Sequence, residues 1–115
     1  MTITRHDPGA RFCRAVVHNG IVYLAGFVAE DTAQGTEGQA RDILAQIDAA
    51  LAKAGTSKAR LLTASVWLRD IADFAQLNAA WDAWIDRANM PVRATVEARL
   101  AGPEYRVEIQ VTAAL

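Results

Sequence analysis

The sequence predicts an α+β fold in which two amphipathic helices lie on one face of a mixed β-sheet, in the order β-β-β-α-β-α-β-β. Three observations support this prediction. Apolar residues recur every three or four positions at about 39–54 and 71–88, which is the spacing of one helix face. Residues 92–100 and 105–113 alternate between apolar and polar, as half-buried strands do. Residues 61–68 are apolar on both faces and predict a strand in the middle of the sheet.

The N-terminal part of the chain predicts three short strands. Residues 2–5 are expected to form an edge strand that ends in a turn at 7–9. Residues 12–17 and 21–25 predict the next two strands, which His18-Asn19-Gly20 joins because Asn-Gly favours a tight hairpin turn. Gly26 follows directly and indicates a bulge or a close approach of the backbone.

Both helices carry recognisable end signals. Thr36 and Gln39 fit a capping box after a polar loop, so we expect a helix that runs to about Ala54 and ends at Gly55. Asp70 is expected to cap the second helix, which Asn89-Met90-Pro91 ends. The two apolar stripes consist of Ala40, Ile43, Leu44, Ile47, Ala50 and Leu51, and of Ile71, Phe74, Leu77, Trp81, Trp84 and Ile85.

The two C-terminal strands predict a hairpin, because turn-forming residues 101–104 lie between them. Opposite charges then meet across the pair in one register, with Arg99 beside Glu104 and Glu97 beside Arg106. The same register gathers four residues on one polar face: Arg93, Thr95, Glu108 and Gln110. Arginine binds carboxylates through two hydrogen bonds and glutamate transfers protons or orients water, so this face is a candidate site for a small carboxylate. The alternative is an ordinary solvated sheet face.

Composition narrows the functional classes. Residues 1–115 suffice for one domain, and 52% hydrophobic residues suffice for a core. A formal net charge of −1 gives no electrostatic attraction for nucleic acid or an anionic membrane. Cys13 is the only cysteine, which predicts a reducing, cytoplasmic setting, and it has no metal-ligand spacing with either histidine. The sheet face without helices is expected to mediate self-association.

Three motifs occur together in one known family. They are Pro91-Val92-Arg93-Ala94-Thr95-Val96-Glu97 followed by Val107-Glu108-Ile109, then Asp73-Phe74-Ala75 with Asn78, and Ile21-Val22-Tyr23-Leu24-Ala25-Gly26. On these motifs, which span nearly the whole chain, it resembles the RidA/YjgF family of enamine/imine deaminases. The resemblance implies a chorismate-mutase-like fold and a homotrimer with a ligand cleft at each subunit interface. It also implies hydrolysis of reactive 2-imino acids, of the 2-aminoacrylate type, to 2-keto acids and ammonia without a cofactor.

The resemblance also implies roles for individual residues. Arg93 matches the arginine that holds the substrate carboxylate, and Glu108 matches the glutamate that positions or activates the attacking water. Asn78 matches an asparagine near the cleft, and Gly26 matches a glycine whose backbone borders the site. By the same resemblance Arg93 and Glu108 are the catalytic candidates.

Three positions differ from the archetypal members of that family. Phe12 stands in place of a tyrosine, Ala25 in place of a serine and Thr95 in place of a cysteine. The cleft is therefore expected to be more apolar, which changes substrate preference. Three alternatives remain open: a non-catalytic, regulatory carboxylate-binding protein, a deaminase for larger imines, and the ribonuclease activity attributed to some members. The pI of about 6.1 and the absence of a basic patch argue against the last.

Overall fold

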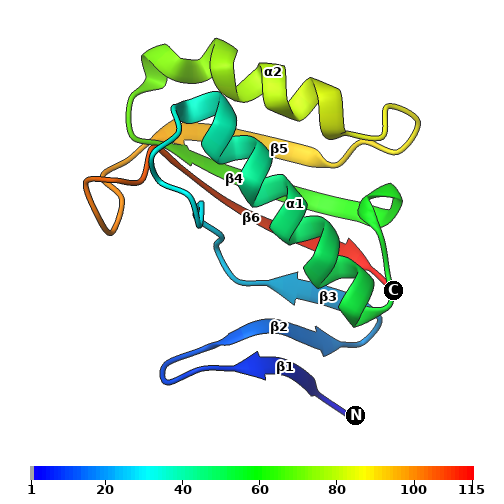
Figure 1. Ribbon diagram of the computed structural model, residues 1–115. Coiled ribbons are helices and arrows are strands. Elements are labelled where there is room, and N and C mark those ends of the chain that lie inside the picture. Colours follow the sequence, from blue (N-terminus) through cyan, green and yellow to red (C-terminus); the bar gives the residue numbers. More distant parts are fainter. Residues whose placement is uncertain (1) are drawn as a thin grey trace.

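The computed structural model describes residues 2–115, which form a six-stranded sheet in the order β1-β2-β3-β6-β4-β5. Helices α1 (Thr36–Ala54) and α2 (Phe74–Trp84) lie side by side on one face of this sheet (Figure 1). The strands are β1 (Thr4–Pro8), β2 (Cys13–His18), β3 (Ile21–Leu24), β4 (Leu61–Leu68), β5 (Val92–Glu97) and β6 (Val107–Ala114). Short 3₁₀ turns, η1 (Lys58–Arg60) and η2 (Ile71–Asp73), precede β4 and α2. The predicted fold class and element order are confirmed.

The hydrophobic core lies between the helices and the sheet. Both predicted helix stripes supply it, and their largest fully buried side chains are Ile43, Leu44, Ile47, Leu51 and Leu77. Alternate residues of the inner strands face them, including Val22, Val66, Leu68, Val107 and Ile109. Each fully buried aliphatic side chain of this kind stabilises the fold by about 1.5–3 kcal/mol relative to exposure. The core therefore fixes which face of each strand points toward the helices.

The N-terminal hairpins follow the prediction with small shifts. β1 extends to Pro8, and the turn predicted at 7–9 lies further on, where the Gly9 N–H donates to the Phe12 carbonyl over 2.8 Å. Pro8 is tolerated in the strand because β1 lies at the edge of the sheet and needs no second partner. Asn19 and Gly20 have φ values of 52° and 75°, as the predicted tight turn requires.

The first helix does not begin with the predicted capping box. Gly35 is its N-cap and supplies no side chain, while the Thr36 hydroxyl donates to Asp73 over 2.7 Å. The Gln39 side chain is fully buried, and the two N–H groups of its amide are shared among the carbonyls of Thr32, Gln34 and Glu104, which lie 3.3, 3.1 and 3.0 Å from the nitrogen. Its amide oxygen accepts the Arg106 N–H over 2.9 Å. Tertiary partners have thus replaced the local bonds of the capping box.

The second helix is shorter than predicted. Asp70 caps the η2 turn by accepting the Ala72 N–H over 2.9 Å, and α2 begins only at Phe74. It ends at Trp84 instead of about residue 88, because Ile85 adopts an extended conformation with ψ 142°. Ile85 is nevertheless buried, so the chain turns there without losing the last residue of the apolar stripe.

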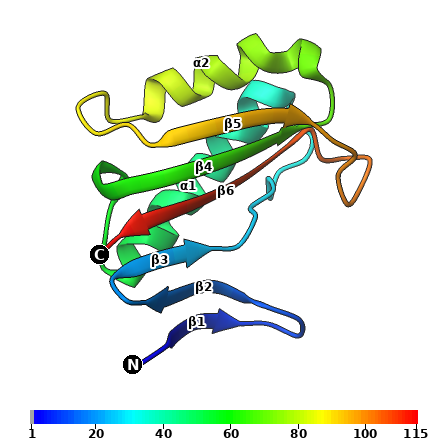
Figure 2. The ribbon, with the colours of Figure 1, turned by 180° about the vertical axis from the view of Figure 1, so that it is seen from behind.

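The predicted C-terminal hairpin is wrong. β4 lies between β5 and β6, pairing parallel with β5 and antiparallel with β6, and residues 98–106 cross over its end (Figure 2). The Ala98 N–H donates to the Leu68 carbonyl, and the Arg69 N–H donates to the Arg106 carbonyl. The physical reason is that β4, α2 and β5 form a β-α-β crossover, which places its two strands parallel. The apolar β4 also gains a neighbour on each side.

The pairing also overturns the predicted polar patch. Arg93 and Thr95 lie opposite Ala64 and Val66, whose side chains are buried beneath the helices. Glu108 lies opposite Trp67, on the other face of the sheet. Arg93 and Glu108 therefore do not share a face of one chain.

The face of the sheet away from the helices is uncovered in this chain (Figure 2). On β5 it carries Val92 and Val96, which are 71% and 49% exposed, and on β3 it carries the exposed Tyr23. Among residues 2–115, neither helix has the length and apolar character that a bilayer crossing requires.

Candidate functional site

Arg93 is held at the edge of the sheet by side chains of α2. Its guanidinium donates to the Asn78 side-chain oxygen over 2.9 Å. The guanidinium carbon lies 5.0 Å from the centre of the Trp81 ring and 5.8 Å from that of Phe74. Cation–π contact and one hydrogen bond thus fix the group while leaving other N–H donors free.

The charge of Arg93 is not neutralised by an ion pair with any of residues 2–115. Burial lowers the pKa of its guanidinium, and the charge of Asp82 partly opposes this shift. Arginine nevertheless stays protonated near neutral pH. This group is therefore a preorganised cation that can accept a carboxylate.

Thr95 adds a hydroxyl two residues farther along the same face of β5. Its Oγ1 is buried and has no hydrogen-bond partner among the residues that the structure describes. Leaving such a group unpaired costs about 1–3 kcal/mol, so a partner from a ligand or from a second chain is expected.

Glu108 belongs to a second group, on the uncovered face. A cavity of about 440 Å³ is lined there by Phe12, Ala25, Gly26 and Glu108, together with Cys13, Val16, Tyr23, Leu24 and Gln110. Phe12 is 63% exposed, so its ring stands open at this cavity. Phe12 and Ala25 contribute apolar surface to its wall, while Glu108 and Gln110 contribute polar groups.

Gly26 allows the Glu108 carboxylate to lie against the backbone. A Cβ at this position would stand 2.2 Å from Oε2 of Glu108 and 3.1 Å from its carboxyl carbon. The glycine is thus needed for close approach, which its place directly after a strand had indicated. Burial raises the pKa of Glu108, and no donor among residues 2–115 hydrogen-bonds its carboxylate. It is therefore a candidate proton acceptor.

The structure thus divides the predicted site residues into two groups. Arg93, Asn78 and Thr95 lie between β5 and α2, whereas Phe12, Ala25, Gly26 and Glu108 lie on the uncovered face. One chain does not bring the two groups together. Sequence reasoning assigned Phe74 and Trp81 only to a helix stripe and missed their contact with Arg93. The spacing of Phe74, Asn78 and Trp81 on one helix face was the available signal.

Among residues 2–115, the His, Cys, Asp and Glu side chains form no cluster of three that could hold a metal ion. Cys13 is a free, half-buried thiol in the wall of the Glu108 cavity.

Comparison of the sequence and the fold with known proteins finds similar proteins along the whole of residues 2–115. The family model described as Endoribonuclease L-PSP matches residues 2–115. A RutC family protein of Haemophilus influenzae is 47% identical over 114 residues, covering 98% of each chain. A 2-iminobutanoate/2-iminopropanoate deaminase of Salmonella typhimurium is 31% identical over 90 residues, covering 76% of this chain and 67% of the deaminase. The crystal structure of a YjgF family protein of Neisseria meningitidis superposes with a TM-score of 0.94 at 46% identity, covering 99% of this chain and 95% of the other.

Proposed function

This chain belongs to the endoribonuclease L-PSP family, also called the RidA/YjgF family, and we propose that it hydrolyses reactive 2-imino acids to 2-keto acids and ammonia. The observation that carries the proposal is Arg93, an unpaired cation held by Asn78 and Trp81. A fixed guanidinium of this kind suits a carboxylate substrate. The similarity to a deaminase that acts on 2-imino acids supports the same substrate class. The reaction needs no cofactor, and the single cysteine favours a cytoplasmic setting.

We place the complete site between two chains of a homo-oligomer, with a trimer expected from the family resemblance. Arg93 and Glu108 lie on opposite faces of one sheet, so a single chain cannot present both to one small molecule. The exposed apolar residues of the uncovered face, including Val92 and Val96, offer a surface for such an assembly. Arg93, Asn78 and Thr95 of one chain would face Glu108 and Gly26 of its neighbour.

The chemistry then follows from the two groups. Arg93 binds the carboxylate of the 2-imino acid, and the free Thr95 hydroxyl is placed to hydrogen-bond the substrate. Glu108 takes a proton from a water molecule as the water oxygen bonds to the imine carbon and forms a carbinolamine. Glu108 returns that proton to the nitrogen, which completes the neutral carbinolamine. The hydroxyl proton then passes through Glu108 to the amino nitrogen as the carbon–nitrogen bond breaks, which releases ammonia, leaves the 2-keto acid and restores the carboxylate. The raised pKa of Glu108 favours this proton transfer.

The required acceleration is modest, because simple imines already hydrolyse in water. A positioned proton-transfer group contributes typically about 10²–10⁴-fold. Orientation of the substrate by Arg93 adds to this factor. No further catalytic group is needed.

The experiment that tests the proposal uses an amino-acid oxidase to generate imines from alanine, leucine and phenylalanine. Loss of each imine is followed by trapping the remainder as the semicarbazone, with and without the protein. We expect faster imine loss with the protein, and no acceleration with Arg93→Ala. Arg87→Ala serves as the control, because Arg87 is an exposed arginine outside both groups. An Arg93→Ala variant as active as the parent would contradict the assignment.

A second experiment tests whether the site is shared between chains. Arg93→Ala and Glu108→Ala, each expected to retain only a small residual activity alone, are unfolded, mixed in equal amounts and refolded together. With random assembly, each site draws an intact Arg93 with probability one half and an intact Glu108 with probability one half. About a quarter of the sites should therefore recover activity. No recovery in properly assembled mixtures would show that one chain supplies both residues.

The alternative is a carboxylate-binding protein without turnover, which acts as a regulator. The observation that favours it is the wall of the Glu108 cavity, where Phe12 and Ala25 offer no side-chain hydrogen bond. In that case carboxylates would bind with dependence on Arg93, while no imine of the panel would be consumed faster. Preference for the phenylalanine-derived imine would instead indicate a deaminase for larger substrates.

A further inference from the structure

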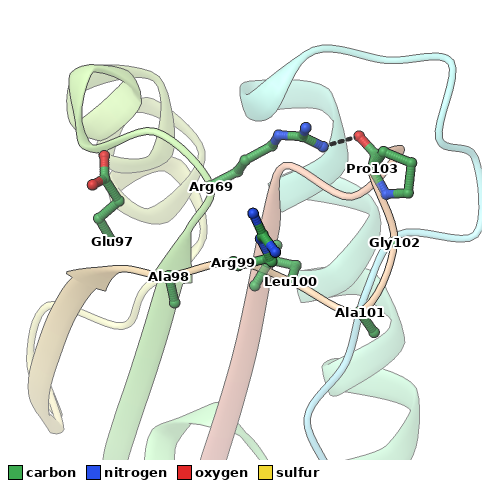
Figure 3. Close-up of a pocket in the computed structure, with 8 residues that line it drawn as sticks. All are labelled: Arg69, Glu97, Ala98, Arg99, Leu100, Ala101, Gly102 and Pro103. Atoms are coloured by element: carbon green, nitrogen blue, oxygen red, sulfur yellow. Dashed lines mark hydrogen bonds between the residues drawn. The ribbon is translucent and has the colours of Figure 1, made fainter.

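A second cavity lies outside both groups, at the end of the sheet where the chain passes from β5 to β6. It measures about 700 Å³ and is lined by Arg69, by Glu97 and by residues 98–103. We call residues 98–103 the arch, because they cross the end of β4 (Figure 3). Neither Arg93 nor Glu108 lines this cavity.

Two arginines point into the cavity. Figure 3 shows the guanidinium of Arg69 extending to the Pro103 carbonyl, to which it donates a hydrogen bond, and the guanidinium of Arg99 directed into the same space. Within residues 2–115, Arg99 makes no side-chain hydrogen bond, and neither arginine forms an ion pair. Two like charges that share one cavity repel each other, and an anion between them removes this repulsion.

Two neighbouring acidic residues, Glu97 and Glu104, lie beside the cavity without pairing with these arginines. Glu97 lines the cavity, but its carboxylate accepts the Ile71 N–H over 3.1 Å. The Glu104 carboxylate lies beside Gly102, where an added Cβ would stand 2.6 Å from Oε1. Neither carboxylate forms an ion pair with Arg69 or Arg99. Within residues 2–115, both guanidinium groups therefore stay free of ion pairs and keep N–H donors for an anion, with the carboxylates of Glu97 and Glu104 nearby.

We propose that the arch cavity is a second binding site, separate from the proposed imine site, for the oxyanion group of a small organic molecule. The oxyanion is a phosphate or a carboxylate, since guanidinium groups bind both through pairs of N–H donors. The guanidinium group of Arg99 makes no hydrogen bond within residues 2–115, so all of its N–H donors are available. The guanidinium group of Arg69 donates to the Pro103 carbonyl and keeps its other N–H donors available. The volume of about 700 Å³ leaves room for an organic remainder beyond the anionic group.

The test is a nuclear magnetic resonance titration of the ¹⁵N-labelled protein at low, constant ionic strength. One arm uses inorganic phosphate and the other uses succinate, so that the two anion chemistries are compared directly. We expect the backbone amides of 98–103 to shift with saturation in at least one arm. Loss of one charge-assisted contact should raise the dissociation constant about tenfold in Arg99→Gln and in Arg69→Gln. Arg87→Gln, which removes one exposed arginine elsewhere, should bind as the parent does.

Arg93→Gln separates this site from the proposed imine site. If the arch is an independent site, its amides shift in Arg93→Gln as they do in the parent, even where imine turnover is lost. The inference is overturned if neither anion shifts the arch amides, if Arg99→Gln binds as tightly as Arg87→Gln, or if Arg93→Gln abolishes the shifts. Dispersed amide spectra of the free variants verify that each has folded.

Discussion

Replacing Gly26 by alanine tests the geometry of Glu108 with a single methyl group. The new Cβ would stand 2.2 Å from Oε2 of Glu108. An ordinary contact between such atoms is about 3.5 Å, so the carboxylate oxygen must retreat by about 1.3 Å. A misplacement of about 1 Å at a reacting group can cost about 10²-fold in rate. We therefore expect kcat/KM for the preferred imine to fall about a hundredfold in Gly26→Ala.

The same substitution should leave the fold nearly as stable as before. Gly26 is not among the residues with positive φ, so alanine can adopt its backbone conformation. Turning the Glu108 side chain off its rotamer costs about 0.5–1.5 kcal/mol. Alanine offsets part of this, because it lowers the entropy of the unfolded chain by about 0.4–1 kcal/mol. Denaturant unfolding should therefore show a change within about 1 kcal/mol.

The assay pairs the imine panel with two control variants. In Gly35→Ala the added Cβ meets its nearest atom, on Gln76, at 4.0 Å, so activity should not change. In a Glu108→Ala background, Gly26→Ala should cost nothing further, because the two residues act through one carboxylate. The reasoning is refuted if Gly26→Ala is as active as the parent, or if it lowers the residual activity of Glu108→Ala by a similar factor.

Three further predictions concern other side chains. Gln39→Leu should lower the free energy of unfolding by about 3 kcal/mol in denaturant melts, because it leaves three carbonyls and the Arg106 N–H without their buried partner. The control Gln76→Leu replaces an exposed glutamine and should change this free energy little. Asn78→Ala should raise KM for the imine about tenfold, because Arg93 loses the hydrogen bond that orients it, and an unchanged KM would argue against that role. The pKa of Glu108 is raised in the folded protein. Ionisation of Glu108 therefore lowers the free energy of unfolding as the pH rises from the ordinary pKa of a glutamate through the raised pKa. The melting temperature of Glu108→Gln minus that of the parent should therefore increase from pH 4 to pH 7. A difference that shrinks with rising pH would contradict a raised pKa of Glu108 in the folded protein.

Local sequence signals determined most of the secondary structure. The stripes that contain Ile43, Ile47 and Leu77 placed both helices, and the alternation along Val107 and Ile109 placed β6. These signals work because helical and extended backbones repeat at fixed periods, so burial on one face is visible in the order of residues. End signals were less informative where tertiary partners competed for the same side chain, as Arg106 and Glu104 do for Gln39.

The division of the candidate site into two groups was decided only by the tertiary structure. Alternation shows that Arg93 and Thr95 share a face of one strand, and that Glu108 and Gln110 share a face of another. It does not show which strands are neighbours, because pairing depends on contacts between residues far apart in the chain. The insertion of β4 between β5 and β6 turned Arg93 toward α2 and Glu108 away from it.

The sequence by itself thus determined the elements, the resemblance to the family and the identity of the candidate residues. The tertiary structure decided on which face of the sheet each candidate lies, and therefore that Arg93 and Glu108 of one chain lie on opposite faces. The physical reason is that the period of a strand is set locally by backbone geometry. Its partner and its orientation toward the helices are set by the non-local β-α-β crossover and by burial of the core.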